Sequence, residues 1–354
     1  MSANLYRVAI VGAGTLKGKE LKDTLNQSDF PALDIKLLDD DESLGLLDVV
    51  GGEPTFVQAV TAENFDDIKV AFFASEQEFT RKHWTMARDA GAGIILVDLS
   101  YALEAEKGAV LRAPWVTGGV VTAGEDANVL AESRAQGLPE IIIPAHPAAI
   151  VLAMLLERAR TVSEMRTVVA TIFEPASEHG RRGMDELHQQ TINLLSFQPL
   201  PTGVYDAQVA FNMLARYGGN SSRSLEVIER RIADHFQKIA SPRVPIPSLM
   251  LAQAPIFHGH AFSVYIELEK KAAVGDFAQG LAGPHVEIAR AGEAPNNVAA
   301  AGRDEVLVSL RRDAQHENAF WLWAASDNLR IETLNAVEAA KQALAGTSVS
   351  GGSK

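Results

Sequence analysis

The first third of the chain alternates two patterns of hydrophobic and polar positions. Short continuous apolar runs, such as YRVAIVG at residues 6–12 and VAFFAS at residues 70–75, are separated by stretches whose apolar residues recur at helical spacing. Continuous apolar runs are typical of strands that are buried on both faces of a parallel sheet. The alternation therefore predicts βαβ units and a doubly wound α/β domain over residues 1–135.

The pattern changes after about residue 135. A strongly apolar helix, PAAIVLAMLLERA, is followed by strand-like segments such as TVVATIFEP, HAFSVYIELE and AFWLWAASD. These segments predict a second domain with a mostly antiparallel sheet. The segment NLRIETLNAVEAAKQAL then has the spacing of a helix with one apolar face, and we expect the Gly/Ser-rich residues 346–354 to be a disordered tail.

Composition narrows the possible functions. The chain has 354 residues and a formal net charge of −13, which argues against nucleic acid as a partner, because phosphate binding needs clustered Lys and Arg. It has no cysteine, so disulfides, thiolate metal sites and thiol catalysis are excluded. The sequence has no signal-peptide pattern and no uninterrupted apolar stretch of about 18 residues. We therefore expect a cytoplasmic protein without a membrane span.

A glycine-rich turn joins the first predicted strand to the first predicted helix. Gly12, Gly14 and Gly18 have the spacing G-x-G-x-x-x-G, one residue longer than the common dinucleotide fingerprint. Glycines at such a turn let the backbone approach a pyrophosphate, whose charge lies at the helix N-terminus. The βαβ context favours a present or ancestral dinucleotide site. The alternative is a turn that only packs the first helix.

Acidic residues follow the second predicted strand, at Asp39, Asp40, Asp41 and Glu42. An acid at this place can accept hydrogen bonds from the ribose hydroxyls of NAD. The same acids would repel the 2′-phosphate of NADP, so we expect NAD to be preferred if a dinucleotide binds. The alternative is a solvated acidic turn.

Six motifs, read in order, resemble landmarks of the aspartate-semialdehyde dehydrogenase family. They are IPAHPAAI, ATIFEPASEHGRRGMDEL, VAFNML, APIFHGHAFSV, WLWAASDNLR and LNAVEAA, and they keep the family's order and spacing over nearly the whole chain. The resemblance implies a Rossmann-type domain of residues 1–135 that is completed by a C-terminal helix over residues 327–345. It also implies an α+β domain, residues 136–326, that carries the catalytic positions and forms a homodimer.

The resemblance also locates departures from the family at its catalytic positions. The family's Asn-Pro-Asn-Cys motif falls on residues 143–146, so His146 stands where the family has its nucleophilic cysteine. The glutamine of its Tyr-Gln motif falls on Glu174, while its catalytic histidine is kept as His260. The family reaction forms a thiohemiacetal, passes hydride to NADP and releases the acyl group to phosphate. A neutral imidazole at a helix N-terminus is a poor substitute for a thiolate in that reaction.

The substrate-binding positions depart as well. Gln253 and Glu104 stand where the resemblance places two anion-binding arginines, and the acid that binds the substrate amine falls near Glu226 or Glu229. Losing two arginines removes the planar clamps that bind carboxylate and phosphate. The family's Usg-type relatives share this pattern in outline. We expect such a chain to have abandoned the family reaction.

The implied cofactor positions are concentrated in the first domain, and NAD or NADP is the cofactor that they would bind. Thr15 stands where the family has its phosphate-turn glycine. The full set implied by the resemblance and the glycine turn is Gly12, Gly14, Thr15, Leu16, Gly18, Asp39, Ser75 and Asn328.

Two hypotheses stay open. The first is a nucleotide-binding homodimer without the family's turnover, which acts by binding a small molecule or an active paralogue. The second is an enzyme of altered chemistry, in which His146, Glu174 and His260 converge in one pocket and perform acid–base or metal-assisted work, with His179 nearby. Against the second, the same side chains could simply hydrogen-bond one another, and we expect no bound metal.

Overall fold

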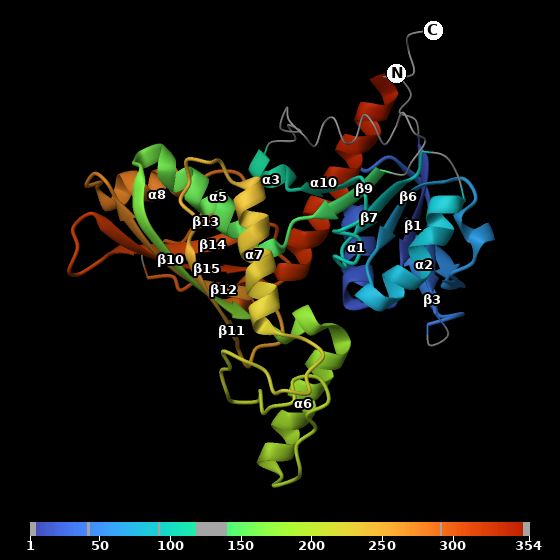
Figure 1. Ribbon diagram of the computed structural model, residues 1–354, viewed down its shortest axis with the longest axis horizontal. Coiled ribbons are helices and arrows are strands. Elements are labelled where there is room, and N and C mark those ends of the chain that lie inside the picture. Colours follow the sequence, from blue (N-terminus) through green and yellow to red (C-terminus); the bar gives the residue numbers. More distant parts are fainter. Residues whose placement is uncertain (1–4, 41–42, 91–92, 118–139, 291, 350–354) are drawn as a thin grey trace. The chain divides into compact units, whose positions relative to one another are not determined.

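The computed structural model describes residues 5–40, 43–90, 93–117, 140–290 and 292–349 (Figure 1). It divides into two compact units, one formed by residues 1–145 together with 332–354 and the other by residues 146–331.

The first unit contains a seven-stranded sheet with the order β5-β2-β1-β6-β7-β9-β8, in which every strand pairs in parallel with its neighbours. This sheet confirms the predicted Rossmann-type domain. Its strands are β1 (Tyr6–Val11), β2 (Ala32–Asp39), β5 (Gln58–Ala59), β6 (Ile68–Phe73), β7 (Ile95–Asp98), β8 (Ala109–Arg112) and β9 (Glu140–Pro144), and a separate hairpin is formed by β3 (Leu47–Val50) and β4 (Glu53–Phe56).

Two apolar layers cover this sheet because side chains along each strand alternate between its faces. On β1, Val8 and Ile10 pack with residues of α1 (Leu16–Gln27) and α10 (Asn328–Val349). Ala9 and Val11 pack on the other face, together with residues of α2 (Gln77–Asp89). The described residues of this unit also form the short helices η1 (Ala62–Phe65) and α3 (Pro114–Thr117).

Two boundaries differ from the sequence-based expectation. Strand β9, which the pattern assigned to the second domain, lies in the first sheet between β7 and β8. Its run of Ile residues is buried on both faces, which suits a parallel sheet. Helix α10 continues to Val349 instead of ending at residue 345, because adding residues to a formed helix costs little compared with starting one. Residues 350–354 of the expected tail lie outside the described residues.

The second unit contains a six-stranded mixed sheet with the order β11-β10-β12-β15-β14-β13. The pairs β10–β12, β12–β15 and β14–β15 are antiparallel, which confirms the expected mostly antiparallel sheet. Its strands are β10 (Met165–Glu174), β11 (Ser248–Gln253), β12 (His260–Leu268), β13 (Val286–Ile288), β14 (Val306–Arg312) and β15 (Ala319–Ser326).

Helices cover one face of this second sheet. Helix α5 (Pro147–Val162) contacts β10, α7 (Leu225–Ile239) contacts β11, and α8 (Val274–Leu281) contacts β13 and β14. The opposite face carries Met250 and Trp323, which lie in one cross-strand row with Thr171 and Ser263 and are 51% and 39% exposed. We call this the open face. The remaining helices are η2 (Ala176–His179), α6 (Gly180–Leu195) and α9 (Asn297–Ala300).

Candidate functional site

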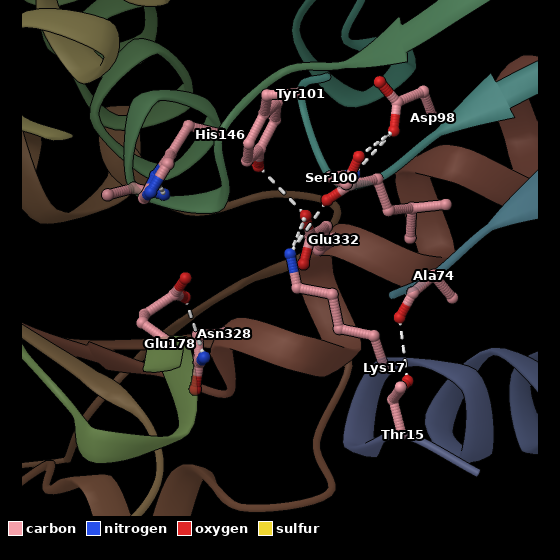
Figure 2. Close-up of polar contacts among 12 residues, drawn as sticks. Thr15, Lys17, Ala74, Asp98, Ser100, Tyr101, His146, Glu178, Asn328 and Glu332 are labelled. Atoms are coloured by element: carbon pink, nitrogen blue, oxygen red, sulfur yellow. Dashed lines mark hydrogen bonds and ion pairs between the residues drawn. The ribbon is translucent and has the colours of Figure 1, made fainter. Parts of the chain in front are cut away.

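The glycine turn of the first unit is a close-packed structure. Gly12 has a φ of +90°, and a Cβ there would lie 2.7 Å from the Cβ of Ser75. Thr15 is the N-cap of α1, and its hydroxyl accepts from Gly18 N at 2.9 Å and lies 2.7 Å from Ala74 O (Figure 2). Leu16 is the first residue of the helix, whose first-turn N–H groups have no acceptor within the helix. This arrangement suits an anion at the helix N-terminus.

Asp39 holds the glycine turn from the end of β2. Its Oδ2 accepts from Gly14 N at 2.6 Å, and its Oδ1 accepts from Asp40 N at 2.9 Å. A Cβ on Gly14 would lie 2.8 Å from Asp39 Oδ2, so only glycine permits this approach. An ionised carboxylate has about four acceptor positions, so capacity remains for further donors. The expected acids Asp41 and Glu42 lie outside the described residues.

A buried ion pair next to this turn was not anticipated from the sequence. Lys17 Nζ donates to Glu332 Oε1 at 2.8 Å and to Leu99 O at 2.9 Å, and Tyr101 OH donates to the same Glu332 oxygen at 2.9 Å (Figure 2). The one signal in the sequence is a lysine inside a glycine motif whose neighbours are otherwise small or apolar. The pair joins α1 to α10. Glu104, by contrast, is exposed in the segment between β7 and β8.

His146 stands at the start of α5 in the second unit. It is the N-cap residue, its Nδ1 accepts from Ala148 N at 3.2 Å, and its own N–H donates to His235 Nδ1 at 2.9 Å. The missing N–H of Pro147 at the next position costs the helix nothing. The rings of His146 and His260 are 5.9 Å apart, so the structure brings these two predicted residues together.

Four fully buried polar residues form a row at the end of the second sheet. The register pairs Glu174 with Gln253 on β11 and His260 with Ser326 on β15. Since Phe173 pairs with Ala261, the next step of the same register brings Glu174 alongside His260. Opposite residues in neighbouring strands have Cβ atoms about 5 Å apart. We call Gln253, Glu174, His260 and Ser326 the polar row.

Burial raises the pKa of Glu174 to about 8, and the negative charge of Glu178 adds to this effect. Glu174 Oε1 lies 3.4 Å from His179 Nε2, while His260 Nε2 lies 3.7 Å from Glu178 Oε1. The charges of His260 and Arg223 oppose the shift. The polar row therefore contains an acid that holds its proton far more tightly than an exposed glutamate does.

Gln253 is committed to bonds inside the protein. Its Nε2 donates to Glu174 O at 2.9 Å and to Ala254 O at 2.8 Å, and its Oε1 accepts from Tyr217 OH at 2.7 Å. Because the Tyr217 proton is directed at Gln253, His179 Nε2 must be the donor in its 2.6 Å bond to Tyr217. Both N–H donors of the Gln253 side chain are in use.

Two other predicted site residues also bind within the protein. Asn328 Nδ2 donates to Glu178 Oε1 at 2.8 Å (Figure 2), and its Oδ1 accepts from Gly259 N at 3.0 Å. Glu229 on α7 accepts from Leu251 N at 2.7 Å with Oε2. Asn328 thus ties the start of α10 to η2 and to the residue that precedes β12 in the second unit, and Glu229 ties α7 to β11.

Sequence reasoning missed several residues that line the polar row. Tyr217 and Tyr205 pack edge-to-face with His179, at ring separations of 5.3 Å and 5.0 Å, and Glu178 adds a second carboxylate. The only signal for Glu178 was its place beside His179 in the family-like ATIFEPASEHG segment. Nothing in the sequence pattern singled out the two tyrosines.

Across the described ranges, no group of three or more His, Cys, Asp or Glu side chains has a geometry that could hold a metal ion. The metal-assisted form of the second hypothesis therefore has no ligand set among these residues. Within the same part of the chain, no helix is long and apolar enough to cross a membrane.

Comparison with known proteins confirms the resemblance. Residues 7–123 match the model for the semialdehyde dehydrogenase NAD binding domain, and residues 156–331 match that for the semialdehyde dehydrogenase dimerisation domain. A USG-1 protein homolog of Pseudomonas aeruginosa is 32% identical over 335 residues, covering 93% of this chain and 95% of that protein. The aspartate-semialdehyde dehydrogenase of Rickettsia bellii is 27% identical, covering 95% and 97%.

A solved structure gives the same result for the fold. That of a probable aspartate-semialdehyde dehydrogenase from Pseudomonas aeruginosa matches with a TM-score of 0.82 and 30% identity, covering 96% of this chain and 99% of the other. The chain therefore belongs to the aspartate-semialdehyde dehydrogenase family, with an NAD(P)-binding domain followed by a dimerisation domain.

Proposed function

We propose that this chain is a dinucleotide-binding homodimer that does not turn over aspartate semialdehyde. The observation that carries the proposal is the complete absence of cysteine, together with the placement of His146 at the start of α5. The family reaction needs a thiolate that forms an acyl intermediate. His146 Nδ1 already accepts a hydrogen bond from the helix backbone, so it is not a nucleophile poised for attack.

The contacts of Gln253 support the same proposal for substrate binding. An arginine clamp offers two parallel N–H donors to a carboxylate or phosphate. Gln253 is the residue that the resemblance places at such a clamp, and both of its side-chain N–H groups donate to backbone carbonyls. The semialdehyde's carboxylate would find no donor there.

The residues of the glycine turn fit a nicotinamide dinucleotide. The first-turn N–H groups of α1 suit the pyrophosphate, and the remaining acceptor positions of Asp39 suit the ribose hydroxyls. A second phosphate next to the Asp39 carboxylate would meet like charge, so NAD is preferred over NADP. When bound, such a cofactor supplies hydride-transfer chemistry, and the turn residues hold and orient it.

The open face supports a homodimer. Exposed Met250 and Trp323 form an apolar surface with Phe173, whose ring lies 5.8 Å from that of Trp323. A second copy of the same face would cover this surface through a twofold-symmetric contact. The match to a dimerisation domain over residues 156–331 agrees with this role.

The test is an assay of the full-length protein with aspartate semialdehyde, phosphate and either NAD or NADP. We expect no reduced cofactor above a blank without protein, while an active family member assayed in parallel gives turnover. Dinucleotide titration of the same sample should show saturable binding. Clear phosphate-dependent NADH or NADPH formation would overturn the proposal.

A second candidate is an acid–base enzyme of altered chemistry, and the raised pKa of Glu174 favours it. A carboxyl that keeps its proton near neutral pH can act as a general acid. Under this candidate, Glu174, His260 and His146 would serve a reaction other than thiol-based acyl transfer. An NADH-dependent reduction of a carbonyl compound that Glu174→Gln abolishes would favour this second candidate over the first.

A further inference from the structure

The first turn of α1 has a charge pattern that helices seldom show. It contains Lys17 and Lys19 and no acidic residue. Cations are unfavourable at a helix N-terminus, where the helix dipole is positive and the first N–H groups have no acceptor within the helix. An anion that binds in front of such a turn offsets this cost. The first turn of α1 therefore has more positive charge than the fold itself requires.

The ammonium group of Lys17 is held in a fixed place. It donates to Leu99 O at 2.9 Å and to Glu332 Oε1 at 2.8 Å, and it lies 5.4 Å from the centre of the Tyr101 ring. Tyr101 OH donates to the same carboxylate oxygen, so Glu332 is itself held from a second side (Figure 2). Among the described residues, these acceptors use fewer N–H donors than an ammonium group has. The ammonium is therefore fixed, with a donor left for a bound ligand.

The two members of this ion pair differ in exposure. The Glu332 side chain is fully buried, whereas the Lys17 side chain is 17% exposed. Burial raises the pKa of Asp98, and the charge of Lys17 is one of the effects that oppose this rise. The positive potential of Lys17 therefore extends beyond its partner. The member of the pair that a ligand can reach is the positive one.

We propose that Lys17 is a further binding residue of the dinucleotide site and that Glu332 limits its effect. The inference rests on the proposed function, because it assumes that a dinucleotide places its pyrophosphate in front of α1. The ammonium of Lys17 attracts the pyrophosphate and raises the affinity of the site. The buried carboxylate of Glu332 holds the ammonium in place, and its negative charge offsets part of that attraction.

This role differs from that of an ion pair that only stabilises the fold. If the pair were only structural, loss of either member would weaken dinucleotide binding. If Lys17 attracts the pyrophosphate and Glu332 opposes that attraction, the two losses should change the affinity in opposite directions. Salt screens buried and partly buried charges much less than exposed ones, so both effects should persist at physiological ionic strength.

The test is calorimetric titration of the full-length protein with NAD. Lys17→Met should weaken NAD binding about tenfold or more, because it removes an attractive charge and keeps the Glu332 carboxylate near the pyrophosphate. Glu332→Gln should strengthen NAD binding about threefold or more, because it removes the counter-ion of Lys17.

Lys22→Met is the matched control. Lys22 belongs to the same helix, its side chain is 13% exposed, and its Nζ lies 2.5 Å from Asp48 Oδ1 in another ion pair. It lies beyond the first turn, where the interaction of a charge with the helix terminus has fallen off. This variant should therefore change NAD affinity by less than about twofold.

Circular dichroism checks that each variant folds. Lys17→Met removes the counter-ion of a buried carboxylate, and if it does not fold, the double variant Lys17→Met, Glu332→Gln replaces it. The double variant should bind NAD more weakly than Glu332→Gln does.

The inference is overturned if both single variants weaken NAD binding alike, if neither changes it, or if Lys22→Met weakens it as much as Lys17→Met does. In each of these cases the wild-type protein still binds NAD, and the proposed function stands. A wild-type protein without saturable NAD binding overturns the inference together with the dinucleotide binding in the proposed function.

Discussion

The glycine turn of the first unit and the polar row of the second differ in what they use for recognition. At the turn, the contacting groups are backbone amides, close-packed glycines and one carboxylate that is itself hydrogen-bonded to the turn. In the polar row, everything depends on particular side chains, and several of their atoms lack partners in the described structure. A site made of backbone survives changes of side chain, whereas a site made of side chains can lose its reaction through a few substitutions.

The largest effect is expected from changes that try to restore the reaction. The turnover rate of the wild-type protein should be about a millionfold lower than that of an active relative, which is the size of effect that loss of a nucleophile produces. His146→Cys alone should stay about 100-fold below the triple variant His146→Cys, Glu174→Gln, Gln253→Arg, because the single change brings back no arginine clamp. Phosphate-dependent formation of reduced cofactor measures both. Equal rates for the single and triple variants would show that the clamp position is misassigned.

The backbone site can be broken by one methyl group. Gly12→Ala forces a residue with a side chain into φ +90° and against Ser75, and should lower the free energy of unfolding by about 3 kcal/mol. Gly51→Ala is the control, because Gly51 also has positive φ but nothing lies within 4 Å of its Cβ position. Gly51→Ala should lower the free energy of unfolding by about 1 kcal/mol. Urea denaturation compares the two, and equal losses would refute the packing argument.

Substitutions on the open face test whether side chains of the second unit also stabilise a homodimer. Trp323→Asp should weaken the dimer about 30-fold or more, since it replaces a large interface aromatic by a charge. Phe56→Asp, an exposed aromatic in the β3–β4 hairpin of the first unit, is the matched control and should have no effect. Light scattering over a dilution series gives the dissociation constants. A wild-type protein that is monomeric at micromolar concentration would contradict the proposed homodimer.

Cofactor choice should depend on one carboxylate at the glycine turn. Asp39→Asn should weaken NAD binding about tenfold, through loss of a charge-assisted hydrogen bond to ribose, and should weaken NADP binding less. Asp40→Asn, at the exposed neighbouring position, should change neither. Fluorescence titration with each dinucleotide gives the ratio of NAD affinity to NADP affinity. If Asp39→Asn leaves the ratio of NAD affinity to NADP affinity unchanged, Asp39 does not accept hydrogen bonds from the ribose.

The smallest expected effect is a slope of stability with pH. The pKa of Glu174 is raised from 4.5 to about 8, by burial first and by Glu178 second. Between these values the folded protein keeps a proton that the unfolded chain has lost, so stability should fall as pH rises through this window. Among the described residues, the titratable or charged groups that interact with Glu174 include Glu178, His179, Tyr205, Tyr217, Arg223 and His260.

Glu174→Gln should remove that part of the slope and melt higher than the wild type near pH 8. Thermal melts of both proteins between pH 5 and pH 8 provide the measurement. Parallel curves for the two proteins would mean that Glu174 does not titrate in this window.

The sequence predicted features that depend on local periodicity and on position along the chain. The turn from β1 to α1 follows from an apolar run, glycines and helical spacing, all within about 20 residues. The neighbourhood of His146 and His260 followed from the family resemblance, and the structure gives a ring separation of 5.9 Å.

What the sequence did not predict are contacts between distant residues that have no periodic signal. Tyr217 meets His179 and Gln253 only because the long segment after α6 returns to β11. Lys17 meets Glu332 across more than 300 residues. The membership of β9 in the first sheet was also missed, because a run of isoleucines fits either sheet equally well.

The commitment of Gln253 has a consequence for descent. A side chain whose hydrogen bonds are all made within the protein becomes part of the scaffold. If Gln253 stands where an ancestor had arginine, as the family resemblance implies, a return to arginine would leave Tyr217 and two carbonyls without their partners. The first step back would therefore cost stability before any substrate could be bound. Once the hydrogen bonds of Gln253 were in place, a lineage that carried them would diverge further and would not regain the arginine.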